Sequence, residues 1–411
     1  MCTTLVVGRT RSATGHVILA HSEELGRNSA HRVCAVDARE AAPGERFPLH
    51  SGGGLEQAGR LARHVCTKIF DKRHYPGEHT SGINEHGVAV ANNMAMKKDI
   101  AESGMYDVVP GGIIWTEFLQ LVLERATSAR DGVAMVSALS ERHGLSCDSG
   151  TMIAIADPEE AWWVEIARGG HSAAERVADD EVSVRANCYR IADFAQEFGD
   201  AANQADRYNL DRHGALEARV SGMVDVGPAD LMALVRDVYE GTPLSLTRSD
   251  GSPFRTGRRT VARMNTEACT VLEPRRGLPP PLAHVMWCCL STSLTGVFVP
   301  FHVGITSVEA HYGTAGARYD PASAYWLFAE LAKLVDYRYR ACADLVRHAW
   351  REFEAETFRT LAEAESGCGG LDSIEAAAAI TRYDGTRAAE AVRLLQDLLV
   401  EVKTRAFYED F

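Results

Sequence analysis

The sequence predicts an α+β fold, in which antiparallel sheets are covered by helices. Short alternating apolar segments open the chain and return at 149–186 and 284–305, as expected for half-buried strands. Two segments of helical periodicity separate the first two strand regions, and a long helical region begins near residue 322. This order of strands, helices, strands and helices is typical of an α+β architecture.

Alternating apolar residues and turn signals define the elements of the first part of the chain. They predict two strands at 2–9 and 16–23, joined by a turn rich in small polar residues, and a third strand at 86–93. Apolar residues at helical spacing then predict helices at 115–127 and 129–143.

The middle of the chain is dense in strand signals. An antiparallel meander is expected, with strands at 149–156, 161–167, 173–177 and 182–186. A helix is predicted from Pro228 to about Tyr239, because proline suits the first turn of a helix.

The last part of the chain is helical and charged. A Gly-rich segment at 366–370 and the pair Asp384–Gly385 are expected to divide it into several helices. We expect residues 2–321 to form one domain and residues 322–411 to form a helical extension. This extension is predicted to pack on the domain, and a homo-oligomer interface is its alternative role.

Composition excludes several classes of function. The 411 residues carry a formal net charge of −13 and no Lys/Arg-rich run, which argues against nucleic-acid binding. No apolar run is long enough to span a bilayer, and no signal peptide is visible. The ten cysteines are scattered and the His residues form no HExxH pattern, so we predict a reducing, cytoplasmic location and no metal site.

Cys2 is the residue with the clearest chemical meaning. Cysteine is small enough for methionine aminopeptidase to remove Met1, which would leave a thiol and a free α-amine on one residue. An α-amine has a pKa of about 7.7–8.0, so it can accept the thiol proton near neutral pH without a separate histidine. A cysteine at position 2 without catalytic function is the alternative.

Four stretches of the chain resemble, in order, the cysteine N-terminal-nucleophile dipeptidases. This group comprises dipeptidase A and the secernins (peptidase family C69), and it is related to penicillin V acylase and bile salt hydrolase. The stretches are CTTLVVGRTRSATGHVILAHSEE at 2–24, GINEHGVAVANN at 82–93, the block at 157–191 and GVFVPFH at 296–302.

The resemblance implies a four-layer αββα sandwich with Cys2 at the tip of a central strand. It implies that the Cys2 thiol attacks an amide carbonyl, with its own α-amine as the base. Asn187 corresponds to the side chain that stabilises the oxyanion, together with a backbone N–H near Asn92 or Asn93. This chemistry requires no cofactor and no metal.

The second strand departs from the family pattern. Relatives commonly read Ala-Arg-Asn-Glu-Asp there, whereas this chain reads Ala-His-Ser-Glu-Glu at 20–24. Glu24 aligns with the acid that holds the α-amine or the substrate. His21 replaces an arginine that would lower the thiol pKa, which a histidine does only when protonated. Ser22 replaces an asparagine, so substrate preference is the property most affected.

Two further features are left open by the sequence. The resemblance implies a later arginine near the site, and four candidates fall in the expected segment: Arg255, Arg258, Arg259 and Arg263. Trp162 and Trp163 alternate on a strand, so that one faces the core and the other covers a helix or lines the pocket; Trp163 is our candidate for the pocket.

These features together predict a cysteine-dependent hydrolase of amide or peptide bonds, and more narrowly a dipeptidase acting through a thioester on Cys2. A small peptide or N-acyl amino acid would be its substrate. An acylase or amide-forming acyltransferase with a specialised substrate is the first alternative. A non-enzymatic secernin-like interaction protein is the second. A glutamine amidotransferase is disfavoured because its Arg-Trp-x-Thr-His segment is absent.

Overall fold

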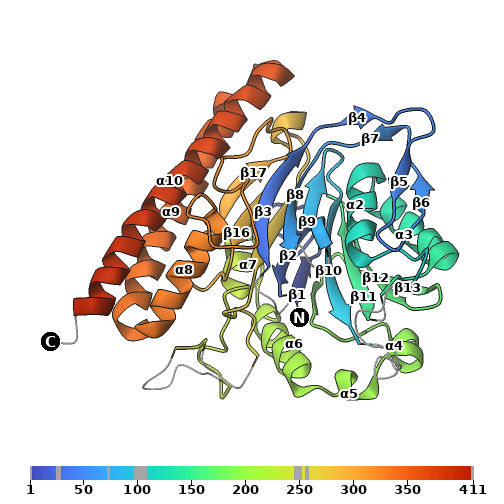
Figure 1. Cartoon of the computed structure of the whole chain (residues 1–411), viewed down its shortest axis with the longest axis horizontal. Coiled ribbons are helices and arrows are strands. Elements are labelled where there is room, and N and C mark those ends of the chain that lie inside the picture. Colours follow the sequence, from blue (N-terminus) through green and yellow to red (C-terminus); the bar gives the residue numbers. More distant parts are fainter. Residues whose placement is uncertain are drawn as a thin grey trace.

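Two antiparallel sheets packed face to face form the centre of the molecule (Figure 1). The computed structural model describes residues 2–24, 29–71, 75–96, 109–147, 149–244, 252–254 and 259–408. The six-stranded sheet has the order β14 (Val182–Arg185), β1 (Thr3–Val7), β2 (Ile18–Glu23), β15 (Ala268–Pro274), β16 (His284–Leu290) and β17 (Val299–His302).

The second sheet has seven strands. Their order is β13 (His171–Arg176), β12 (Ala161–Ala167), β11 (Gly150–Ala156), β10 (Ala89–Ala95), β9 (Tyr75–Asn84), β8 (His64–Asp71) and β3 (Ala30–Val36). Two small ribbons extend from its β3–β8 end, formed by β4 (Arg39–Glu40) with β7 (Arg60–Leu61) and by β5 (Arg46–Pro48) with β6 (Gly54–Glu56).

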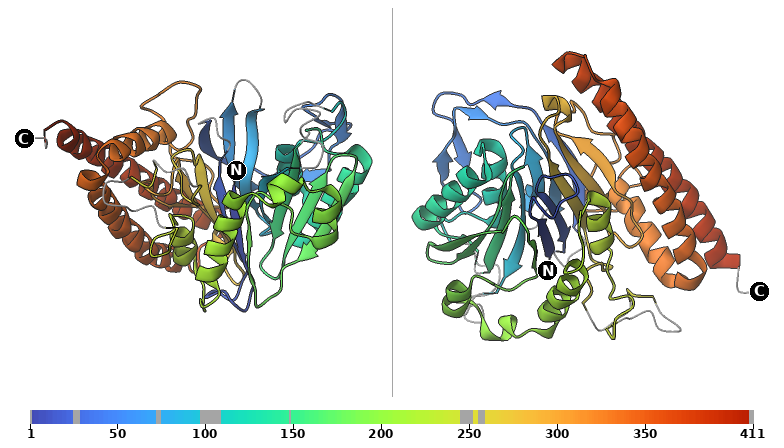
Figure 2. Two further views of the ribbon diagram at one scale, coloured as in Figure 1. Left: turned by 90° about the horizontal axis from the view of Figure 1, so that it is seen from below. Right: turned by 180° about the vertical axis from the view of Figure 1, so that it is seen from behind.

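Helices cover the outer faces of both sheets, and Figure 2 shows these layers edge-on. The seven-stranded sheet is covered by α2 (Trp115–Arg125) and α3 (Ala129–His143). The six-stranded sheet is covered by α6 (Arg207–Val220), α7 (Pro228–Leu234) and part of α9 (Tyr339–Gly367). Short helices α4 (Ala192–Phe198) and α5 (Ala201–Gln204) precede α6. The predicted α+β fold with helical layers around two sheets is confirmed.

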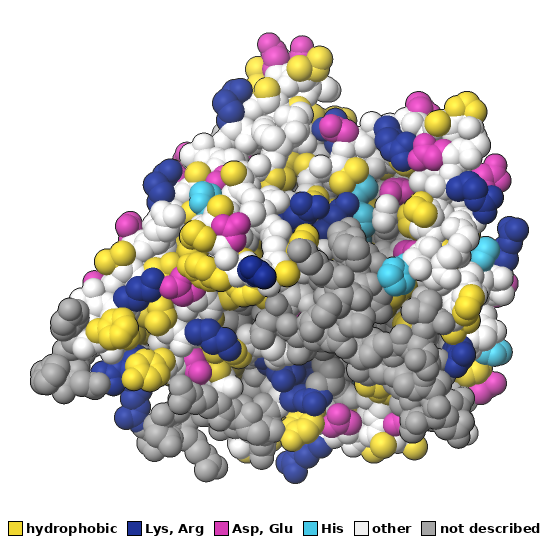
Figure 3. Space-filling view, in the orientation of Figure 1, with side chains coloured by type: hydrophobic (Ala, Val, Ile, Leu, Met, Phe, Trp, Pro, Cys, Tyr) yellow, Lys and Arg dark blue, Asp and Glu magenta, His cyan; other side chains and the backbone are white. Residues whose placement is uncertain are grey.

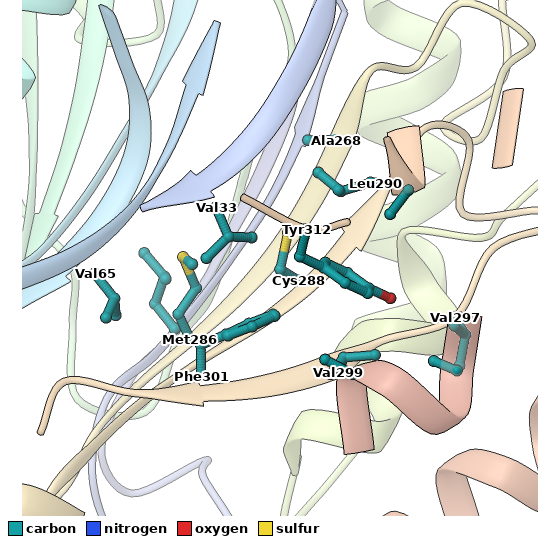
Figure 4. Close-up of a cluster of buried hydrophobic side chains, with 14 of the residues drawn as sticks. Val33, Val65, Ala268, Met286, Cys288, Leu290, Val297, Val299, Phe301 and Tyr312 are labelled. Carbon is teal, nitrogen blue, oxygen red and sulfur yellow. The ribbon is translucent and has the colours of Figure 1, made fainter. Parts of the chain in front are cut away.

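Strand alternation explains the position of the core. Val6 and Leu19 point from the six-stranded sheet toward Ala91 and Ala154 of the other sheet, whereas Leu5 and Ile18 face the outer helices. Figure 4 shows part of the inner core, where Met286 and Cys288 of β16 lie near Val33 of β3 and Tyr312.

The predicted meander is wrong at its last strand. β11, β12 and β13 pair in sequence as expected, but β14 leaves that sheet and pairs with β1 in the other sheet. The side chain of Trp163 on β12 donates to Ser183 Oγ on β14 at 3.2 Å across the interface. β14 therefore connects the two sheets, which local strand propensity cannot reveal.

The helix expected at 228–239 is also shorter than predicted. α7 ends at Leu234, and Tyr239 has a positive φ of 64°. The Asp237 carboxylate accepts a hydrogen bond from the Tyr239 backbone N–H, which closes a turn in place of a further helical turn.

The C-terminal region consists of α8 (Ala324–Tyr337), α9 and α10 (Ser373–Tyr408), with the 3₁₀ turn η1 (Pro280–Leu282) beside α10. The break predicted at 366–370 is confirmed between α9 and α10. The break predicted at Asp384–Gly385 is wrong, because α10 continues through it. Asp384 is buried against β17, where it accepts hydrogen bonds from the backbone and the ring of His302. The division into domains at 321 and 322 stays a prediction.

The outer edge of β17 is paired with side chains of these helices. The backbone N–H of Phe298, just before the strand, donates to Glu354 Oε1 of α9 at 2.9 Å. The N–H of His302 donates to Asp384 Oδ2 of α10 at 2.7 Å. Pro300 lies between them and has no N–H.

Within the described residues, no helix is long and apolar enough to cross a membrane.

Candidate active site

Cys2 lies directly before β1, beside the end of β2. The register pairs Thr3 with Ser22 and Thr4 with His21, so that Cys2 is next to Glu23. Its Sγ lies 3.4 Å from Glu23 Oε1, and the residue is only 4% exposed. Alternation directs Cys2, His21 and Glu23 to the space between the two sheets.

A chain of hydrogen bonds runs from the thiol across this space. Glu23 Oε2 lies 2.9 Å from His21 Nε2, and His21 Nδ1 lies 2.7 Å from Thr4 Oγ1. The Thr4 hydroxyl donates to Asn93 Oδ1 of β10 at 2.7 Å. The chain thus connects the nucleophile on one sheet to Asn93 on the other.

The hydrogen bonds of Asn93 set the direction of this chain. The Asn93 amide donates to two backbone carbonyls, those of Arg185 and Ala186, so its oxygen must accept from Thr4. The Thr4 hydroxyl has one hydrogen and therefore accepts from Nδ1–H of His21. The other ring nitrogen, Nε2, faces Glu23 Oε2, so that the imidazole connects the acid beside the thiol to Thr4.

Charges around Cys2 favour a neutral thiol at rest. Burial raises the pKa of the Cys2 thiol, and the negative charge of Glu23 raises it further. Burial would also raise the pKa of Glu23, but the hydrogen bond and charge of His21 outweigh it, and the pKa is lowered. The thiol therefore needs a base, and the α-amine exposed by loss of Met1, which lies outside the described residues, is the predicted one.

The replacement Glu23→Gln tests this electrostatic arrangement. Removing a negative charge 3.4 Å from the thiol should lower the thiol pKa, so that alkylation of Cys2 by iodoacetamide begins about one pH unit lower. Mass spectrometry of the Cys2 peptide across a pH series gives the profile. Glu352→Gln, at an exposed site on α9, should leave it unchanged. A profile displaced to higher pH would contradict the assignment.

Glu24 points to the opposite side of β2 from the thiol. Its Oε1 accepts from Ser22 Oγ and Thr266 Oγ1, both at 3.1 Å, and its Oε2 lies 3.7 Å from Arg263 Nη1. Burial raises the pKa of Glu24, against the opposing charges of Arg212 and Arg263. The Ser22 hydroxyl is thus engaged with Glu24 in this structure.

Arg212 of α6 is the residue that links the backbone of the nucleophile to Asn187. Its Nη1 donates to the Cys2 carbonyl and to Thr3 Oγ1, both at 3.0 Å. Its Nη2 donates to Asn187 Oδ1 at 2.8 Å and Asn209 Oδ1 at 2.9 Å. The side chain is fully buried, so a single guanidinium orients several polar groups of the site.

Asn187 follows β14, and hydrogen bonds hold both the oxygen and the nitrogen of its side-chain amide. Its oxygen accepts from Arg212, and its nitrogen donates to the Met94 carbonyl of β10 at 2.8 Å. An amide nitrogen has two hydrogens, so one N–H remains to donate to an oxyanion.

Asn92 and Asn93 have different surroundings. Asn92 points away from the thiol face and donates to Thr151 Oγ1 at 3.2 Å, so its side chain is not part of the chain of hydrogen bonds. β10 pairs with β9 only at Ala89, Val90 and Ala91. Among the described residues, the pairing of β10 with β9 ends at Ala91, and the backbone N–H near Asn92 or Asn93 stays a predicted donor to the oxyanion.

The remaining candidates lie farther from this group. Trp163 is buried in the inner core, beneath the guanidinium of Arg185, and its role in substrate binding stays a prediction. Arg263 adjoins Glu24, and Arg259 lies over the ring of Tyr208. Arg255 and Arg258 lie outside the described residues.

Comparison with known proteins identifies the family to which this chain belongs. The model of Peptidase family C69 matches residues 1–211 and 223–352. The chain belongs to peptidase family C69. The predicted family and enzyme class are thereby confirmed, and the chain is an amide-hydrolysing enzyme of this peptidase family.

Similar proteins cover most of this C69 peptidase. Probable dipeptidase B of Lactococcus lactis subsp. lactis (strain IL1403) is 26% identical over 399 residues, which is 84% of this chain and 83% of the relative. Dipeptidase A of Lactobacillus helveticus is 24% identical over 404 residues, 84% of each chain. A mutant conjugated bile acid hydrolase from Clostridium perfringens covers 74% of this chain and 92% of its own, with 12% identity and a TM-score of 0.44.

Sequence reasoning missed two residues of this C69 peptidase that adjoin the nucleophile. The resemblance points to Glu24, whereas strand alternation alone places Glu23 on the same face as His21. Arg212 lies in a helix that was not predicted, and nothing in the local sequence distinguishes it from the exposed arginine at 207. Only the packing of α6 against β1 and β14 identifies it.

Proposed function

We propose that this C69 peptidase is a dipeptidase that cleaves its substrate through a thioester on Cys2. The observation that carries this proposal is the buried Cys2 thiol, with Glu23 and His21 on one side and the Arg212–Asn187 pair on the other. The names of the two relatives above support the dipeptide as substrate.

The reaction follows the chemistry of an N-terminal thiol. The α-amine of Cys2 takes the thiol proton, and the sulfur attacks the amide carbon to give a tetrahedral oxyanion. Collapse breaks the C–N bond, the amine leaves with the proton, and a thioester remains. Water then attacks the thioester, and the sulfur leaves as the acid product forms.

Asn187 is proposed to donate to the oxyanion with its remaining N–H. Loss of one such donor commonly costs about 10²–10³ in kcat, and Asn187→Ala should cost this much with little change in KM. Steady-state kinetics on the best dipeptide measures it. Asn92→Ala is the matched control, because the Asn92 side chain points away from the thiol, and it should retain most of the activity. Equal losses in both variants would remove Asn187 from the reaction.

Glu24 is proposed to bind an ammonium group, either the α-amine of Cys2 or that of the dipeptide. The Glu24 carboxylate is buried close to the start of β1, and the charges of Arg263 and Arg212 partly balance it. A free dipeptide carries an ammonium group that an N-acyl amino acid lacks, so this environment favours the dipeptide.

A pooled library tests the proposal directly. Free dipeptides and N-acyl amino acids are incubated with the protein and with Cys2→Ala, and the loss of each compound is followed by mass spectrometry. Loss of dipeptides that depends on Cys2 would support the dipeptidase and name its side-chain preference. Loss of N-acyl compounds alone would assign an acylase, and new amides formed with an added amine would assign an acyltransferase. No change in either pool would refute the proposed substrate class.

We also propose that the protein acts in the cytoplasm. All ten cysteines lie within the described residues and each is a free thiol, as is usual in reducing compartments.

A homo-oligomer through the C-terminal helices is proposed as well. Large apolar side chains are exposed on these helices: Tyr337, Val400 and Phe407. In Figure 3, apolar side chains lie among charged ones on the left of the view, where Figure 1 shows α8, α9 and α10.

A further inference from the structure

Three potential metal ligands meet on the outer face of the seven-stranded sheet, beneath α2. His64 and Cys66 are alternate residues of β8, and His79 lies on the adjacent strand β9. One ligand atom from each lies within 4.8 Å of the others, and all three residues are buried. The Nε2 atoms of the two histidines are 3.2 Å apart. The group lies on the face of the sheet opposite to the one that faces Cys2.

The Nε2 atoms of the two imidazoles share a hydrogen bond that a metal ion bound to both nitrogens would replace. His64 Nδ1 lies 3.0 Å from the Ala62 carbonyl, which accepts its hydrogen and leaves a lone pair on Nε2. His79 Nδ1 has no hydrogen bond of good geometry within the described residues, although the side chain of Gln120 adjoins its ring. Nitrogens bound to one tetrahedral zinc ion at about 2.0–2.1 Å lie about 3.3 Å apart, close to the separation seen here.

The absence of a side chain at Gly82 lets β9, Cys66 and α2 approach one another closely beside the cluster. Gly82 is opposite Cys66 in the β8–β9 register. A Cβ at position 82 would lie 2.8 Å from Cys66 Cβ and 2.9 Å from Leu123 Cδ1 of α2. Cys34 of β3 is opposite Cys66 on the other side, where it is a candidate fourth ligand.

Charged side chains of both signs, Lys68 and Glu85, lie near the cluster. Burial lowers the pKa of His64 to about 4, and the charge of Lys68 lowers it further while Glu85 opposes. Burial lowers the pKa of His79 in the same direction, again with Lys68. Both rings are therefore neutral at physiological pH, which is the form that binds metals. Burial also raises the pKa of the Cys66 thiol, which would lose its proton on binding a metal.

We propose that His64, Cys66 and His79 form a binding site for a zinc-class transition metal ion. Two imidazoles and one thiolate are a donor set that zinc prefers, and Cys34 or water completes the tetrahedron. The site joins β8 to β9 beneath α2 and is structural, since it lies outside the group of residues around Cys2. The three ligands come from two strands without a short metal motif, which is why the sequence predicted no metal.

Cobalt titration tests the site, because a thiolate–Co²⁺ bond gives a charge-transfer band and tetrahedral Co²⁺ gives intense visible bands. The experiment uses Cys2→Ala throughout, since Cys2, His21 and Glu23 are a second group of potential ligands. The chelator-treated protein should bind one equivalent of Co²⁺ with both signals, and Zn²⁺ should displace it. Absence of the thiolate band would overturn the proposal.

Variants in this background assign the ligands. Adding Cys66→Ser should abolish the thiolate band or weaken Co²⁺ binding by at least about tenfold. Cys288→Ser changes an equally buried cysteine of the inner core and should leave both the band and the affinity unchanged. Circular dichroism confirms folding. If the Cys66→Ser protein does not fold, His79→Gln provides the same test, with at least tenfold weaker binding expected. Unchanged binding in either folded variant would refute the site.

Discussion

Replacing Cys2 by alanine should lower kcat/KM by about 10⁴-fold or more, while the protein remains folded. Alanine is also small enough for Met1 to be removed, so the α-amine stays and only the thiol is lost. The buried sulfur and its contact with Glu23 contribute little to folding, and the free energy of unfolding should fall by about 1 kcal/mol. Kinetics on the dipeptide selected from the library and thermal denaturation measure the two effects.

The control for this variant is a buried cysteine far from the site. Cys368 follows α9 and is 3% exposed, so that Cys368→Ala makes a similar change in volume without touching the thiol chemistry. It should retain full turnover. A Cys2→Ala protein with the activity of the Cys368→Ala protein would exclude Cys2 as the nucleophile.

Replacing Arg212 by methionine should have the second-largest effect, on both stability and activity. Five oxygen atoms lose a donor, including the Cys2 carbonyl and Asn187 Oδ1, and Glu24 loses a compensating charge. Breaking buried charged contacts commonly costs about 3–5 kcal/mol. A displacement of about 1 Å at Asn187 can cost about 100-fold in rate, so kcat should fall by this order while KM changes less.

Arg207 on the same helix supplies the comparison. It is 73% exposed and its ion pair with Asp211 is 3.4 Å long, so Arg207→Met should change stability by no more than about 0.5 kcal/mol. Assays are made well below the melting temperature of each variant. If Arg212→Met matches Arg207→Met in both stability and kcat, Arg212 does not position the site.

The elements near Cys2 were largely predictable because their signals are local. Alternation over residues 2–23 and the small polar turn between the strands predict the β1–β2 hairpin, and the same alternation places His21 on the face of the thiol. The helices α2 and α3 follow from helical spacing, and the Ser128 side chain caps α3 by accepting from Asp131 N–H.

Non-local pairing sets the limit of this reasoning. β14 belongs to a different sheet from the strands that precede it, and Asp384–Gly385 continues a helix because Asp384 hydrogen-bonds to β17. Glycine in a helix interior costs about 1 kcal/mol relative to alanine, and the buried hydrogen bonds between Asp384 and His302 offset this cost. Arg212 and the His64–Cys66–His79 group could not be predicted either, because the residues that they contact come from distant segments of the chain.

The outer edge of β17 has a consequence for how this protein associates with other chains. An edge strand with unpaired N–H groups is a template for strand addition and for aggregation. Here the outward N–H groups of Phe298 and His302 are occupied by carboxylates of α9 and α10, and Pro300 has none. The six-stranded sheet is thus closed to intermolecular strand pairing along β17, and self-association on this side must use helix surfaces.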